Sequence, residues 1–125
     1  MAPTAVTGPL ADAILEPIYA NLEASTQEDV EAYMATLHPD SPAYATTEQL
    51  MQQVFDTYDL SYEIADLVVL SVEDDEARVS FVLTTRKISG PEFRDNEITG
   101  VFILRQDGDV WKIYSQEISN IKYLP

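Results

Sequence analysis

Cysteine is absent from the 125 residues of this chain. Its absence excludes disulfide bridges, thiolate nucleophiles and metal sites built on cysteine. It is also typical of proteins from the reducing cytosol, so we expect a cytoplasmic protein. Histidine occurs once, as His38, and one histidine without cysteine does not complete a zinc site. We expect no metal site and no cofactor.

Positive charge is scarce. Seven basic residues stand against 22 acidic ones, which gives a formal net charge of -15. This charge repels phosphate backbones and anionic lipids, so we expect neither nucleic acid nor a membrane surface as a partner. It would attract a basic protein, which leaves an acidic protein-interaction module as one alternative. High negative charge also serves solubility.

The chain also lacks long hydrophobic runs. No stretch is apolar enough to predict a membrane-spanning helix. Residues 1–9 have neither the basic start nor the apolar run of a signal peptide. We expect residues 1–8 to form a disordered, frayed tail. We expect residues 9–125 to form one domain, because a chain of this length with 46% hydrophobic residues can build a real core.

The first half of the chain has helical periodicity. A first helix is predicted from about residue 10 to 24, with Pro17 expected to kink or restart it. A capping box formed by Ser25 and Glu28 predicts a second helix from about 26 to 37. A third helix is predicted from about 48 to 58. The apolar stripe of the first helix recurs at every fourth residue, at Leu10, Ile14, Ile18 and Leu22.

The second half changes to the alternation of β-strands. Strands are predicted over about 62–72, 78–88, 97–106 and 110–123. Asp107-Gly108 is a favourable hairpin turn. The acidic run Glu73–Glu76 lacks the ligand spacing and central glycine of a calcium loop, so we interpret it as a solvated turn.

The predicted strands carry apolar residues on both faces. Val79, Phe81 and Leu83 point to one face, while Val82 and Ile88 point to the other. The helices can cover only one face. In a chain this short the simplest cover for the other is a second copy, so we expect a homodimer.

Two segments carry a family resemblance. Tyr19–Asp40 holds a helix end, a short turn and a second helix with an acidic end; Val101–Ile113 holds a strand, an Asp-Gly turn and a Trp-Lys-Ile strand. In this order they resemble the nuclear-transport-factor-2-like (SnoaL-like, ketosteroid-isomerase-like) superfamily, over about residues 10–123. The resemblance implies an α+β fold, a cystatin-like cone-shaped roll in which N-terminal helices pack on a curved antiparallel sheet. It also implies an interior pocket and usually a dimer through the outer sheet face. Members include isomerases, cyclases, hydrolases and transport adaptors, so the fold does not decide the function.

The resemblance also implies where isomerase chemistry would lie. The general base would follow the second helix, and hydrogen-bond donors would come from the first helix and a middle strand. The base position falls on Ala45. The donor positions fall on Ile18, with Tyr19 beside it, and on Val101 or Phe102. These residues argue against ketosteroid-isomerase activity, because neither a base nor an oxyanion donor is in place.

Polar residues near the predicted pocket are the ligand-binding candidates: Tyr44, Tyr62, Arg86 and Glu117. Arg86 lies in a mostly apolar strand, and Glu117 on the last strand is its expected partner. The pair would clamp an anionic ligand if it faces inward. If it faces outward, it would form a cross-strand ion pair at the sheet surface or the dimer interface. Trp111 is expected in the core.

His38 and Asp40 are a second candidate pair. They could act as an acid/base couple at the pocket mouth, and with Tyr44 they would make a noncanonical set for a cofactor-independent isomerase or hydrolase. The alternative is a helix-end histidine whose charge complements the helix dipole. Our principal expectation is a homodimeric domain that binds a small apolar or anionic ligand in its pocket.

Overall fold

The computed structural model of the chain describes residues 6–125. Most of the predicted tail, residues 1–5, therefore lies outside the described residues. Next to it, Val6 donates a backbone hydrogen bond of 3.0 Å to the carbonyl of Val69 and packs against the core. Three helices precede four strands, in the order α1 (Pro9–Gln27), α2 (Val30–Ala35), α3 (Tyr44–Thr57), β1 (Asp59–Glu73), β2 (Glu76–Ser89), β3 (Asn96–Asp107) and β4 (Val110–Tyr123).

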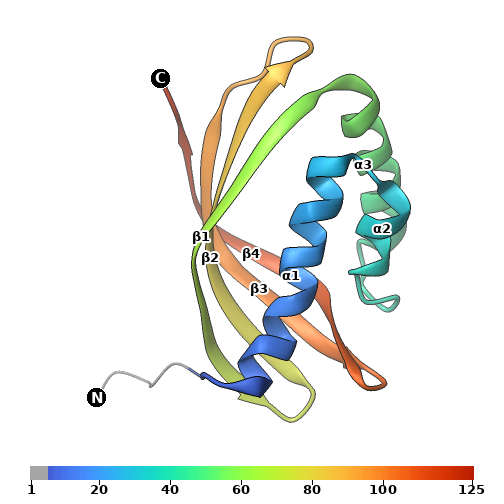
Figure 1. The fold of residues 1–125 in the computed structure, drawn as a ribbon, viewed down its shortest axis with the longest axis vertical. Helices are drawn as coiled ribbons and strands as arrows, with labels where there is room; N and C mark the ends of the chain where they lie inside the picture. Colours follow the sequence, from blue (N-terminus) through green and yellow to red (C-terminus); the bar gives the residue numbers. More distant parts are fainter. Residues whose placement is uncertain (1–5) are drawn as a thin grey trace.

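The four strands form one antiparallel sheet in the order β1-β2-β3-β4, so each strand pairs with its neighbour in sequence. The register shifts within β1 and β4, as expected where bulges bend a sheet. Figure 1 shows the strands curving along one side of α1, with α2 and α3 beyond α1. The prediction of N-terminal helices on a curved antiparallel sheet is confirmed.

Helix α1 is continuous through Pro17 and extends to Gln27, beyond its predicted end. The predicted capping box is wrong, because Ser25 lies inside α1 and its hydroxyl donates to the carbonyl of Asn21 at 2.9 Å. This back-bond to the preceding turn is a common alternative for serine. Glu28 ends α1 in a left-handed conformation, at φ 57°. Asp29 then caps α2, accepting a hydrogen bond from the backbone nitrogen of Ala32 at 3.1 Å.

Helix α3 begins at Tyr44, earlier than predicted, and none of its residues is buried. It touches the rest of the molecule chiefly through α2, where the rings of Tyr33 and Phe55 meet edge to face with centroids 6.2 Å apart. Its packing therefore depends on a few partly buried side chains.

The core lies between α1 and the inner face of the sheet. Its fully buried large side chains come from α1, β2 and β3, and the ring of Phe81 stacks on that of Phe102 at 4.1 Å. Trp111 is 6% exposed, which confirms its predicted place in the core. The predicted division of β2 into two faces is also confirmed, with Val79 and Phe81 buried and Ile88 62% exposed on the other side. Within residues 6–125, no helix has the length and hydrophobicity needed to cross a membrane.

Candidate functional site

A cavity of about 410 Å³ lies between the helices and the inner face of the sheet. α1 contributes one face of its second half, and the loop before α3 and the first turns of α3 close the side opposite the sheet. The apolar lining residues come from α1, the segment after α2, the loop before α3, α3 itself and all four strands: Ile18, Leu22, Leu37, Pro42, Ala43, Met51, Ile64, Leu83, Phe102 and Ile113.

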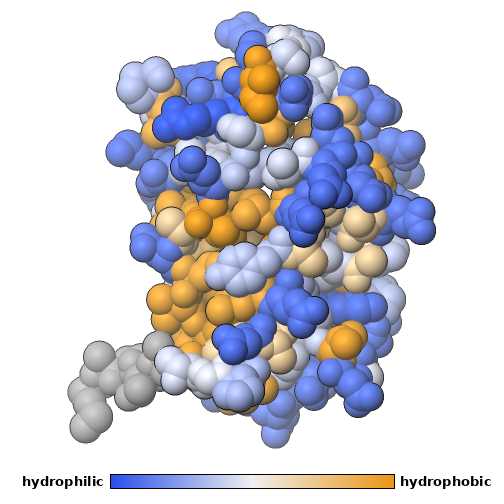
Figure 2. Space-filling view, viewed as in Figure 1, coloured by the Kyte–Doolittle hydropathy of each residue, from blue (hydrophilic) through white to orange (hydrophobic). Residues whose placement is uncertain are grey.

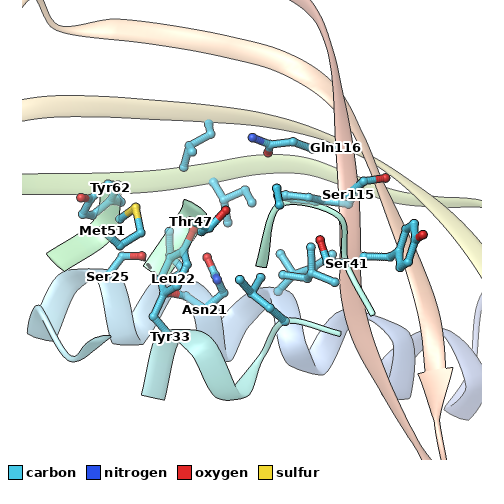
Figure 3. Close-up of a pocket in the computed structure, with 18 of the residues that line it drawn as sticks. Asn21, Leu22, Ser25, Tyr33, Ser41, Thr47, Met51, Tyr62, Ser115 and Gln116 are labelled. Atoms are coloured by element: carbon cyan, nitrogen blue, oxygen red, sulfur yellow. Dashed lines mark hydrogen bonds between the residues drawn. The ribbon is translucent and has the colours of Figure 1, made fainter. Parts of the chain in front are cut away.

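Polar side chains lie at intervals along this apolar wall (Figure 3). Figure 3 shows Tyr62 and Ser25 at one end beside Met51, and Ser115 and Gln116 at the other. Asn21, Tyr33 and Thr47 lie between the two ends. Every lining residue among those that the structure describes is uncharged. The cavity is therefore mainly apolar with several neutral hydrogen-bonding groups, as is typical of small-molecule sites.

A hydrogen-bond network fixes the helical side of the cavity. The side-chain nitrogen of Asn21 donates to the hydroxyl of Thr36 at 2.9 Å. That hydroxyl donates in turn to the carbonyl of Tyr33 at 2.6 Å. The network joins α1 to the end of α2 and so holds Asn21 in place at the cavity wall.

Two tyrosines in the lining resist ionisation. Burial raises the pKa of Tyr33, and the Asn21 side chain partly offsets this rise. Burial, with smaller contributions from Tyr33, Glu28 and Asp59, raises the pKa of Tyr62 to about 12. Both phenols are therefore neutral at physiological pH and available as hydrogen-bond donors.

The four ligand-binding candidates occupy different places. Tyr62 lines the cavity. Tyr44 is not among the lining residues; it begins α3 and packs, partly buried, against the core. Arg86 and Glu117 are outside the cavity lining and exposed, with 54% and 61% of their side chains accessible.

The expected ion pair between Arg86 and Glu117 is wrong. Glu117 pairs with Arg78 at 3.3 Å, and Arg86 lies 4.0 Å from Asp95. The sheet register explains these partners. Val101 of β3 is paired with Ser80 of β2 on one side and with Glu117 of β4 on the other, so Glu117 lies at the same height in the sheet as Ser80. Arg86 is six residues farther along β2 than Ser80, a distance of about 20 Å at the rise of a strand.

The candidate acid/base pair of His38 and Asp40 does not lie at the cavity. His38 is buried, at 7% exposure, and its Nδ1 accepts a hydrogen bond from the backbone nitrogen of Asp40 at 3.1 Å. Its Nε2 lies 3.2 Å from the carbonyl oxygen of Gln106. The ring therefore contacts backbone groups with both nitrogens, and neither His38 nor Asp40 lines the cavity. No group of three or more acidic or histidine residues in residues 6–125 is placed to hold a metal ion.

Sequence reasoning missed most of the polar lining. Asn21 and Ser25 follow Ile18 at helical spacing, so they lie on the face of α1 that meets the cavity. Polar residues on an otherwise apolar stripe were the signal that could have identified them. Tyr33 stands at helical spacing from Val30 and Leu37, a pattern that predicts a buried face of the second helix but not a site. Gln116 carried no signal, because its orientation depends on the register shifts of β4.

Comparison with known proteins identifies the family. The family model described as the C-terminal domain of anti-sigma-I factor RsgI9 matches residues 16–124. This chain belongs to that family. It is similar to anti-sigma-I factor RsgI9 of Acetivibrio thermocellus, with 32% identity over 100 residues. The match covers 80% of this chain and 14% of that protein, so this chain spans only a small part of its relative.

Solved structures with similar coordinates show the fold. An NTF2-like protein from Cytophaga hutchinsonii matches with a TM-score of 0.73 at 18% identity, over 90% of this chain and 98% of that chain. A Nostoc punctiforme protein of unknown function with a cystatin-like fold has a TM-score of 0.72 at 17% identity, over 92% and 93%. A ketosteroid isomerase-like protein from Erwinia carotovora atroseptica has a TM-score of 0.64 at 21% identity, over 88% and 95%. The cystatin-like fold, and with it the structural resemblance to nuclear-transport-factor-2-like proteins, is confirmed.

Proposed function

We propose that this domain binds a small, mainly apolar molecule in the cavity between α1 and the sheet. The observation that carries the proposal is the composition of the lining. Its wall is apolar with neutral donors and acceptors, and none of the lining residues that the structure describes is charged. A pocket of this kind can bury a ligand without paying to desolvate a fixed charge of its own. The anionic alternative rested on Arg86, which lies outside the cavity beside Asp95.

Binding is favoured over acid/base catalysis by the position of the titratable candidates. A general acid or base must come within hydrogen-bonding reach of the reacting atom. His38 uses both ring nitrogens on backbone groups, and Asp40 and Tyr44 are not lining residues. Apolar Ile18 and Phe102 line the cavity where the superfamily resemblance would put hydrogen-bond donors.

A homodimer through the sheet is the second part of the proposal. We call the face of the sheet away from α1 the outer face. It carries the partly or more fully exposed side chains of Val68, Val82 and Val101. Val68 is 36% exposed and its neighbour Leu70 40%. Figure 2 shows a separate group of hydrophobic side chains over β1 and the adjoining part of α1, at the edge of the sheet. Apolar surface of this kind favours association.

Family membership supports a regulatory setting. The relative is named an anti-sigma-I factor, and this chain matches its C-terminal domain. We propose that the domain is the ligand-responsive part of a regulatory protein. A cavity-filling substitution made in the chromosome of the native host should then change the abundance of a defined set of transcripts, and a surface substitution should change none of them.

The binding proposal is tested by filling the cavity. Leu83→Trp places a larger side chain at a lining position, and Val110→Trp is the matched control at a position that is 52% exposed outside the cavity. Calorimetry with 2-ethylnaphthalene, an apolar probe, should show binding by the native chain and the control, and its loss in Leu83→Trp. Binding that persists unchanged in Leu83→Trp would place the probe elsewhere and contradict the proposal. The proposal is contradicted as well if the native chain binds neither 2-ethylnaphthalene nor its ketone analogue 2-acetylnaphthalene.

A further inference from the structure

The polar groups of the cavity differ in how far the protein already satisfies them. The side-chain nitrogen of Asn21 donates to Thr36, and the hydroxyl of Ser25 donates to a carbonyl of its own helix. The hydroxyl of Tyr62, in contrast, makes no hydrogen bond within residues 6–125. It is not among the fully buried atoms that lack a partner, so it is open to solvent or to a ligand at its end of the cavity. A half-buried phenol with a free donor favours a ligand that supplies an acceptor.

The same end of the cavity disfavours negative charge. Burial is the main reason that the pKa of Tyr62 rises to about 12, and the charges of Glu28 and Asp59 add to it. A ligand carboxylate placed beside Tyr62 would meet the same loss of solvent and the same two acidic residues. The lining offers no cation among the described residues to compensate it.

Positive charge has no specific partner there either. A buried ammonium group needs a carboxylate or several acceptors in direct contact. Glu28 and Asp59 act on Tyr62 through space, but neither of them lines the cavity. An uncharged ligand avoids both penalties.

We propose that the cavity selects an uncharged, largely apolar molecule with a carbonyl or ether oxygen, and that the hydroxyl of Tyr62 donates a hydrogen bond to that oxygen. Two further tyrosines line the same cavity, Tyr33 from α2 (Figure 3) and Tyr114 from β4. The inference rests on the proposed function, because it names the ligand class of the same cavity.

Four naphthalenes of similar size separate the possibilities. 2-Acetylnaphthalene carries the carbonyl, 2-ethylnaphthalene lacks an acceptor, 2-naphthoate is an anion, and 2-naphthylmethylammonium is a cation. Affinities are measured by calorimetry for the native chain, for Tyr62→Phe and for Tyr19→Phe. The last variant is the control, since Tyr19 is 53% exposed on α1 and outside the cavity.

The ketone should lose roughly threefold to tenfold in affinity in Tyr62→Phe, which is the net effect of one hydrogen bond. The hydrocarbon should be bound equally by both proteins, and Tyr19→Phe should change neither affinity. Both ions should bind about tenfold or more weakly than the ketone, because the cavity desolvates their charge. The proposed ligand class is wrong if the native chain binds either ion as tightly as the ketone. It is also wrong if Tyr62→Phe leaves the affinity for the ketone unchanged, or lowers the affinities for ketone and hydrocarbon by the same factor. If neither neutral probe binds the native chain, the proposed function itself fails.

Discussion

His38 Nε2 lies 3.2 Å from the carbonyl oxygen of Gln106, a residue 68 positions farther along the chain. Because Nδ1 of the same ring accepts a hydrogen bond from the backbone of Asp40, the neutral ring carries its hydrogen on Nε2 and donates it to Gln106. Two backbone hydrogen bonds lie beside this contact, from His38 to Ile113 at 2.8 Å and from Ile113 to Thr36 at 2.9 Å. Together they fasten the end of α2 to β4 and fix the start of the loop that closes the cavity.

We expect His38→Ala to lower the free energy of unfolding by about 1–3 kcal/mol, because it removes two hydrogen bonds and the packing of a ring that is buried at 7% exposure. Urea denaturation followed by circular dichroism measures this loss. Gln106→Ala is the control, since it keeps the backbone carbonyl; it should change stability by about 0.5 kcal/mol or less. Equal losses in the two variants would show that the ring contact is not what matters.

The element types could be predicted from sequence because they depend on local periodicity. The change from helical spacing to alternation after residue 58, and the Asp107-Gly108 turn, placed all four strands. Helix ends were less predictable, since Ser25 and Asp29 are both good caps and the tertiary structure decides between them. Ser25 is buried inside α1, so the second helix starts from Asp29.

The candidate site was harder to predict because it depends on register. Pairing Arg86 with Glu117 requires the relative positions of β2, β3 and β4, and β4 shifts register against β3 twice. Alternation alone cannot predict such shifts, since each one changes the orientation of the side chains after it. Tyr62 lies in the regular stretch of β1 between Leu60 and Ala65, opposite Thr85, and its inward orientation follows from simple alternation with Ile64.

Tyr62 should make the stability of the domain depend on alkaline pH. Its folded-state pKa of about 12 lies above the ordinary tyrosine value of 10.0. The neutral Tyr62 phenol therefore contributes stability that is fully present below pH 10. This stability is lost as the pH rises from 10 towards 12, because Tyr62 ionises first in the unfolded state. We therefore expect stability to fall more steeply in this window for the native chain than for Tyr62→Phe, as measured by urea denaturation at several pH values.

An ultraviolet titration of the phenolates gives an independent check on Tyr62. The native chain should show an ionisation near pH 12 that is missing from Tyr62→Phe. Tyr19→Phe, at an exposed position, should retain it. Identical alkaline titrations for the native chain and Tyr62→Phe would mean that the phenol is not desolvated.

Helix α3 should be the most easily opened wall of the cavity. It has no buried residue, whereas α1 buries Ile14 and Ile18 completely or nearly so. Amide hydrogens of α3 should therefore exchange faster than those in the middle of α1. Hydrogen exchange with mass spectrometry measures both, and a bound ligand should slow exchange in α3 because Thr47 and Met51 line the cavity. Equal protection of the two helices without ligand would contradict this expectation.

The outer face of the sheet gives the test of the proposed dimer. Val101 lies in β3 between Ser80 and Glu117, near the middle of that face. In a dimer, Val101→Glu would bury two like charges close to Glu117 of a chain whose net charge is already -15, and this costs several kcal/mol per interface. We expect sedimentation to show twice the chain mass of 14.0 kDa for the native protein and the monomer mass for Val101→Glu. Circular dichroism should be unchanged, because Val101 is not part of the core cluster.

Val110→Glu adds the same charge at an exposed position beside the hairpin turn and should remain dimeric. A native chain that sediments as a monomer at micromolar concentration would rule out this dimer, and dissociation of both variants would indicate a general effect of charge, not an interface at the outer face.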